Sequence, residues 1–278
     1  MGQTFIKQYL YSDQREETND VLEYEIETEE SPIIENKLFK HKEKKALLIG
    51  INYKDNYTTD DDLYGCVNDC FNIRKKLNNM GFKDENIIML INSDATKSNI
   101  KSQINNLVNL SQKKELDIWF SYSGHGGGSF SYFEKDNQKE YICPDDYLVN
   151  GMIDDVWLKT NFVDKLSPKT NCFVLMDCCH SGSNFNLPYQ YPDVNLNTNS
   201  ICNIIKISGC RDNQYSMDAF DNKSKTYQGA LTNQFLSDIK EDSILNIYQK
   251  VKKNLKNNNF SQIPNLTYSD YDLIHCSL

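Results

Sequence analysis

A reactive thiol follows a short apolar run in the second half of the chain. Residues 174–176 are Val-Leu-Met and lead into Asp177, Cys178 and Cys179, after which the residues become small and polar. A buried parallel strand presents reactive groups in this way at its carboxyl end. Because side chains alternate along a strand, Asp177 and Cys179 share one face and Cys178 points to the other. Cys179, close to the turn residue Gly182, is therefore the predicted nucleophile.

The base for this thiol must be one of the four histidines in the chain, which are His41, His125, His180 and His275. The first lies in a charged leader, and the last is three residues from the end. His180 directly follows Cys179, and neighbouring residues diverge as they leave a strand. His125 remains, in a glycine-rich loop after a second apolar run. Two parallel strands that end side by side would bring His125 and Cys179 together as base and nucleophile.

Length and composition indicate a soluble globular protein. The 278 residues fit one α/β domain at 43–278 after an acidic leader at 1–42. Hydrophobic residues make up 39% of the chain, and no run reaches the roughly 18 apolar residues of a membrane span. A net charge of −9 disfavours nucleic acid as a partner. The absence of a signal segment and nine cysteines without disulfide-scaffold spacing favour a cytoplasmic location.

Apolar runs and helical patterns alternate along the domain. The runs that predict strands are 45–53, 86–91, 118–123, 171–176 and 201–208. Helical spacing covers 66–80, the segment after Thr96, 156–166, 231–239 and 244–255. The composition of 129–140, 184–200 and 218–229 is typical of loops. Strand, helix, strand is the parallel crossover pattern, so the sequence predicts an α/β fold.

Cysteine and histidine spacing gives little support to a zinc site. Cys178, Cys179 and His180 could be combined with Cys66 and Cys70, but no Cys-x-x-Cys pair exists. Adjacent cysteines do not easily point at one tetrahedral ion. We therefore do not expect zinc.

Five segments, in this order, resemble motifs of the metacaspases, which are cysteine peptidases of the caspase-like clan. They are 63–69, 122–126, 153–155, 177–183 and 229–232, and the resemblance runs from about Lys45 to Pro264. One such motif would be weak, but five at plausible distances are specific. The resemblance, to a type I-like catalytic domain, implies a caspase-like sandwich with a central, mostly parallel sheet flanked by helices on both faces.

The resemblance also implies a reaction. Cys179 would attack a peptide carbonyl, His125 would carry the proton, and the backbone N–H groups of Gly126 and Cys179 would form the oxyanion hole. Cleavage would follow arginine or lysine in protein or peptide substrates. The matching substrate pocket (S1) residues are Cys66, Asp69, Ser123 and Asp177. The alternatives are that Cys66 is a small core residue and that Asp177 is a structural carboxylate.

Members of this family bind calcium near the active-site loops, as an activator and not as a catalytic metal. The matching positions are Asp146, Asp154 and Asp155, with Asn186 where the family has a fourth acid. Hard oxygen ligands suit Ca²⁺, but the amide lacks a formal charge and should lower the affinity. The alternative is that these are ordinary surface carboxylates of an acidic protein.

Two processing hypotheses follow, one from the alternating pattern in the leader and one from two lysines in a polar segment. The leader, in which Leu22, Tyr24 and Ile26 alternate with glutamates, would obstruct the cleft until it is cut at a lysine such as Lys37, Lys40 or Lys42. Self-cleavage would also occur around Lys223 and Lys225. The rival functions are a catalytically silent regulatory or interaction module and a thioesterase or amidase that uses the same dyad. Family resemblance implies a monomer.

Overall fold

The computed structural model describes residues 3–4, 28–29, 37–41, 43–54, 62–130, 138–178, 185–192, 194–209, 218–221, 226–239 and 242–278. The chain divides into two compact units, Met1–Asn36 and Lys37–Leu278. In the first unit, β1 (Gln3–Thr4) pairs antiparallel with β2 (Thr28–Glu29). The alternating segment at Leu22–Ile26, Lys42, Lys223 and Lys225 lie outside the described residues.

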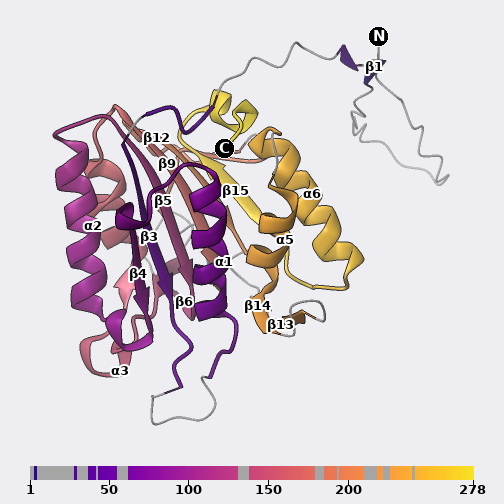
Figure 1. Cartoon of the computed structure of the whole chain (residues 1–278). Coiled ribbons are helices and arrows are strands. Elements are labelled where there is room, and N and C mark those ends of the chain that lie inside the picture. The colour runs from indigo at the N-terminus through magenta and orange to yellow at the C-terminus, as the bar shows by residue number, and fades with distance from the viewer. Residues whose placement is uncertain are drawn as a thin grey trace. The chain divides into compact units, whose positions relative to one another are not determined.

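The second unit is built on an eight-stranded sheet (Figure 1). Its strand order is β11-β10-β15-β12-β9-β5-β3-β4. Five of these strands are parallel: β3 (Lys44–Gly50), β4 (Ile87–Ile91), β5 (Leu116–Ser123), β9 (Thr170–Asp177) and β12 (Asn203–Ser208). Antiparallel strands at one edge are β10 (Tyr189–Gln190), β11 (Val194–Asn195) and β15 (Asn265–Tyr268). The predicted mostly parallel sheet is confirmed.

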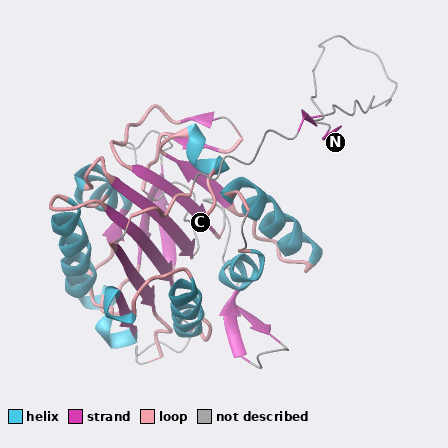
Figure 2. Cartoon of the chain, turned by 45° about the horizontal axis from the view of Figure 1, so that its top comes forward, coloured by secondary structure: helices cyan, strands magenta, loops and turns pink. Residues whose placement is uncertain are grey.

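Helices cover both faces of this sheet (Figure 2). One face packs against α1 (Cys66–Asn79), α5 (Ala230–Asp238) and α6 (Ile244–Asn257). The other face packs against α2 (Lys97–Ser111) and α4 (Asp155–Asn161). Side chains of β5 alternate between the two cores: Trp119 packs with the first set and Phe120 with the second. The sandwich architecture predicted from the family resemblance is therefore present.

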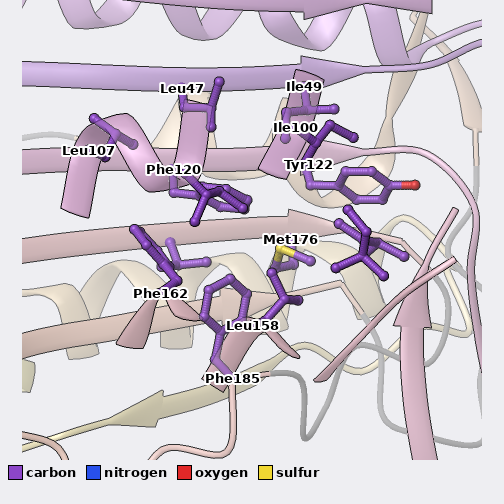
Figure 3. Packing of buried hydrophobic residues seen from close by; sticks show 14 of the residues in the cluster. Leu47, Ile49, Ile100, Leu107, Phe120, Tyr122, Leu158, Phe162, Met176 and Phe185 are labelled. Carbon is purple, nitrogen blue, oxygen red and sulfur yellow. The ribbon is translucent and has the colours of Figure 1, made fainter. Parts of the chain in front are cut away.

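The core on the side of α2 and α4 includes side chains near the carboxyl ends of β5 and β9. Phe120 of β5 contacts Phe162 and Phe185, with ring centroids 5.5 and 5.6 Å apart (Figure 3). Met176 of β9 and Tyr122 of β5 lie beside them, and both are fully buried. Burial of each large apolar side chain contributes about 1.5–3 kcal/mol, so this packing fixes β5 and β9 against each other.

All three segments with loop composition contain strands instead, and 184–200 holds β10 and β11 of the central sheet. Strand β6 (Gly126–Phe130) pairs antiparallel with β7 (Gln138–Ile142), which also pairs with β8 (Ile153–Asp154) in a three-stranded sheet. Strands β13 (Asp218–Asp221) and β14 (Thr226–Gly229) pair antiparallel. These small sheets pair polar strands with one another and lack the apolar runs of the central sheet. Composition alone therefore missed them.

The boundary of the leader also differs from the expected one. Residues 37–41 belong to the second unit. The N–H of Leu38 donates to the carbonyl of Ser277 (2.8 Å), and Phe39 packs edge-on against Phe82 at 5.5 Å. The N–H of His41 donates to the buried carboxylate of Asp117 (2.7 Å). Two apolar side chains and these hydrogen bonds tie the segment to the domain.

The helix assignments agree with the sequence except at two points. The side chain of Thr96 accepts from the N–H of Asn99 (3.2 Å) and caps α2 as predicted. The helix predicted over 156–166 ends at Asn161 and continues as a 3₁₀ turn, Val163–Lys165. A short helix, α3 (Tyr147–Asn150), precedes β8. Among the described residues, none of the helices has the length and apolar character needed to cross a membrane.

Candidate active site

The two strands predicted to carry the dyad are neighbours in the sheet. Strand β5 pairs in parallel with β9, and Ser123, at the end of β5, lies opposite Asp177, at the end of β9. The N–H of Gly124 donates to the carbonyl of Asp177 (3.4 Å), so the chains remain adjacent one residue beyond the strands. His125 stands two residues after Ser123, and Cys179 stands two residues after Asp177. Cys179 itself lies outside the described residues.

His125 is half-buried and rests against a tyrosine. Its ring centroid is 4.5 Å from that of Tyr53, with an angle of 34° between the planes. Its backbone N–H donates to the hydroxyl of Tyr53 (3.0 Å), and its carbonyl accepts from the hydroxyl of Tyr122 (2.7 Å). The loop that carries the imidazole is therefore fixed on both sides of the residue.

The glycine before this histidine is required by space. A Cβ at Gly124 would lie 2.7 Å from the hydroxyl oxygen of Tyr122 and 2.9 Å from that of Tyr53. Gly126 begins β6, opposite Ile142, and is half-buried. The role of its N–H in an oxyanion hole remains a prediction.

The two acids of the predicted substrate pocket meet at one glycine. Asp69, in the first turn of α1, is fully buried, and Asp177 is 5% exposed. The N–H of Gly229 donates to Asp69 Oδ1 (3.0 Å). A Cβ at Gly229 would lie 2.2 Å from Asp177 Oδ2 and 2.6 Å from Asp69 Oδ2. The two carboxylates are therefore neighbours, and only glycine fits between them. Gly229 lies in one of the five motifs, but the sequence indicated no role for it.

Asp177 also has a structural task. Its Oδ2 accepts from the N–H of Thr232 (2.8 Å) and from the hydroxyl of Thr232 (2.9 Å). Thr232 lies in the first turn of α5, so the carboxylate caps this helix and opposes its positive end. The structural alternative for Asp177 thus has direct support, and a helix terminus holds the carboxylate in a fixed orientation.

Cys66 and Ser123 lie at the same end of the sheet as these acids. Cys66 opens α1 and is 4% exposed, and Ser123 is 2% exposed at the end of β5. The backbone of Cys66 lies close to β3, since a Cβ added at Gly50 would be only 2.4 Å from the carbonyl oxygen of Cys66. Both side chains are buried at this level, which leaves a core role for Cys66 open.

The predicted calcium ligands fall into two sets. Asp155 is buried, and its Oδ2 accepts from the amide of Asn186 at 3.4 Å. Asp146 instead accepts from the N–H of Lys97 (2.8 Å), at the start of α2, and Asp154 accepts from the N–H of Trp157 (2.7 Å). Across the described ranges, no three His, Cys, Asp or Glu side chains are grouped as a metal would need. Of the four predicted ligands, Asp155 and Asn186 thus contact each other, whereas Asp146 and Asp154 accept from N–H groups at the starts of α2 and α4.

Comparison with solved structures supports the architecture. A protein of Geobacter sulfurreducens superposes with a TM-score of 0.61 at 20% identity, over 84% of this chain and 96% of that one. Caspase-1 from Spodoptera frugiperda superposes with a TM-score of 0.50 at 13% identity, over 86% of this chain and 90% of that one. At these identities the likeness concerns the fold alone. It confirms the predicted caspase-like α/β architecture.

Sequence comparison places residues 44–188 in the family described as metacaspase, peptidase C14 domain. Metacaspase-1 of Candida albicans is 30% identical over 297 residues, which cover 81% of this chain and 65% of that protein. The chain thus spans slightly less than two thirds of this relative. The family match covers strands β3 to β9 and the loops that follow them, including both predicted dyad positions. The chain belongs to the metacaspase family.

Proposed function

We propose that this protein is a cysteine endopeptidase that cuts peptide bonds after arginine or lysine. The observation that carries the proposal is the register of β5 and β9, with Ser123 opposite Asp177. Since His125 and Cys179 each follow that pair by two residues, this register supports a dyad at the rim of the sheet. The imidazole takes the thiol proton as the sulfur attacks the carbonyl carbon. The same proton then passes to the leaving amine, and water hydrolyses the thioester.

The acidic pair supports the choice of substrate. A guanidinium or ammonium group is attracted by two adjacent carboxylates, whereas an aspartate side chain would meet like charges. Asp69 and Asp177 are neighbours at Gly229, one on α1 and one at the end of β9. The buried surroundings strengthen such contacts relative to water.

The first prediction concerns the dyad. Cys179→Ala and His125→Ala should each lower kcat/KM for release of a fluorophore from an arginyl peptide amide by about 10³-fold or more. The control is His275→Ala, an exposed histidine at the far end of the chain. An arginyl thioester, assayed in parallel, tests the thioesterase alternative. Cleavage of the thioester without cleavage of the amide would contradict the peptidase proposal, and no turnover of either would favour a silent module.

The second prediction concerns specificity. Asp69→Asn should lower the ratio of kcat/KM for arginine over citrulline, an uncharged analogue of similar shape, by about 10- to 100-fold. The matched control is Asp84→Asn, because Asp84 is an exposed carboxylate that pairs with Arg74 at 3.0 Å. Thermal unfolding of both variants separates a loss of charge recognition from a loss of fold. An unchanged ratio in a folded Asp69→Asn variant would rule out this carboxylate as the specificity determinant.

Calcium activation is part of the proposal and rests on Asp155 and Asn186. Carboxylate and amide oxygens are hard ligands of the kind that Ca²⁺ takes, and an ion bound there would add positive charge beside the active-site loops. Water molecules would complete the coordination. Asp146 and Asp154 are already engaged with the helix N-termini described above.

The third prediction tests this pair. Asp155→Asn should weaken Ca²⁺ binding at least about tenfold in calorimetry on the Cys179→Ala background, because a ligand charge is lost. Asp164→Asn serves as the control, since Asp164 pairs with Lys159 at the end of the same segment. If the protein binds no Ca²⁺, or if Asp155→Asn leaves the affinity for Ca²⁺ unchanged, the proposed calcium site is wrong.

The fourth prediction concerns self-processing. Asp221 of β13 and Thr226 of β14 are paired, and Lys223 and Lys225 lie between them in the sequence. Intact mass after addition of Ca²⁺ should show a cut at one of these lysines and, for leader release, at Lys37, Lys40 or Lys42. Cys179→Ala should remain whole. An active enzyme of full mass would contradict this part of the proposal.

A further inference from the structure

Two buried tyrosines join the backbone at His125 to the backbone at Cys143. Tyr53 lies just beyond β3 and Tyr122 lies in β5, and both are fully buried. Their hydroxyl oxygens are 3.0 Å apart. Each hydroxyl has one proton to give, which limits the patterns in which these bonds can form.

The N–H of Cys143 lies 3.1 Å from the carbonyl of His125, and the Tyr122 hydroxyl lies 2.9 Å from the carbonyl of Cys143. Beside these contacts, one pattern lets each hydroxyl donate once and accept once. The N–H of His125 donates to Tyr53 (3.0 Å), and the Tyr53 hydroxyl donates to the carbonyl of Cys143 (2.6 Å). The N–H of Cys143 donates to Tyr122 (3.2 Å), and the Tyr122 hydroxyl donates to the carbonyl of His125 (2.7 Å). The four bonds form a closed ring in which both hydroxyls donate once and accept once. Both backbone groups of His125 are thereby held by phenols.

Burial keeps both phenols available as donors. Loss of hydration raises the pKa of Tyr53 and the pKa of Tyr122 well above the ordinary tyrosine value. The hydroxyls therefore keep their protons throughout the neutral range. Buried hydrogen bonds of this kind are costly to break, because the group left behind has no water to replace its partner.

Tyr53 makes a second contact, with the imidazole itself. Its ring lies against that of His125, as described above, and is fixed from the side by Tyr147, whose ring meets it edge-on at 6.1 Å. The φ angle of Tyr53 is +58°, a left-handed conformation that costs a non-glycine residue free energy. A strained backbone at a buried residue that touches the predicted base indicates that the ring must be in this one place.

We propose that Tyr53 and Tyr122 are positioning residues for His125: the hydroxyl ring fixes the backbone of the histidine, and the aromatic face of Tyr53 fixes the plane of its imidazole beside Cys179. This inference rests on the proposed function, in which His125 is the base. Tyr53 lies outside the five motifs and Tyr122 begins one of them, and the sequence indicated no role in the reaction for either.

Removal of single hydroxyls tests the inference. Tyr53→Phe and Tyr122→Phe each open the ring of hydrogen bonds, and Tyr53→Phe keeps the aromatic contact. The matched control is Tyr248→Phe. Tyr248, on α6, is also buried, and its hydroxyl donates to the backbone carbonyl of Pro264 (3.1 Å). Each ring-opening variant should lower kcat on the arginyl amide about tenfold or more and leave KM within about twofold. The control should change neither, although all three lose a buried hydrogen bond.

A second readout does not depend on peptidase activity. In wild type and in the Cys179→Ala variant, the amide proton of His125 should exchange slowly, and Tyr53→Phe should accelerate its exchange at least about tenfold relative to amides of β9. Tyr53→Leu, which also removes the ring, should lower kcat below that of Tyr53→Phe. If Tyr53→Phe and Tyr122→Phe match Tyr248→Phe in both kcat and His125 exchange, the inference is wrong while the peptidase proposal stands. If the wild type cleaves no substrate but Tyr53→Phe still accelerates exchange of the His125 amide, the proposed function is wrong. The role of the two tyrosines in holding the backbone of His125 then stands.

Discussion

The in-register parallel pairing of β5 and β9 is the constraint on which the site depends. Ser123 lies opposite Asp177, and both strands are buried along their whole length. A slip by one residue would turn every side chain to the other core, which packing of Phe120 and Met176 in one cluster does not allow. The residues that leave the two strands are therefore delivered to the same rim of the sheet. The chemistry proposed for His125 and Cys179 depends on this pairing of β5 with β9.

Around this rim, distant parts of the chain supply the groups that orient the reactive ones. The amino end of α5 meets Asp177 through Thr232, and Gly229 lies against both Asp69 and Asp177. Two phenols on the other side hold His125. In the proposed substrate pocket, the structural and functional roles of Asp177 would coincide, because a carboxylate that caps a helix is held rigidly and charge recognition requires a rigid group. Stability and specificity should thus be hard to separate by mutation at Asp177.

Much of this arrangement could be predicted from the sequence, and the failures have physical causes. Long apolar runs predicted β3, β5 and β9, because strands buried on both faces must be apolar throughout. The short polar strands β6, β7, β13 and β14 gave no such signal. The contact between Gly229 and Asp69 joins residues 160 positions apart, and that between Tyr53 and His125 joins residues 72 apart. Spacing along one chain does not encode such contacts.

In the proposed dyad, one rim of the sheet brings the imidazole of His125 to the sulfur of Cys179. A crystal structure of the protein with Cys179 modified by an arginyl peptide ketone inhibitor measures this most directly. We expect an imidazole nitrogen within about 3–4 Å of the sulfur, with the guanidinium of the inhibitor against Asp69 and Asp177. A histidine ring turned away from the modified sulfur, or a guanidinium bound elsewhere, would contradict it.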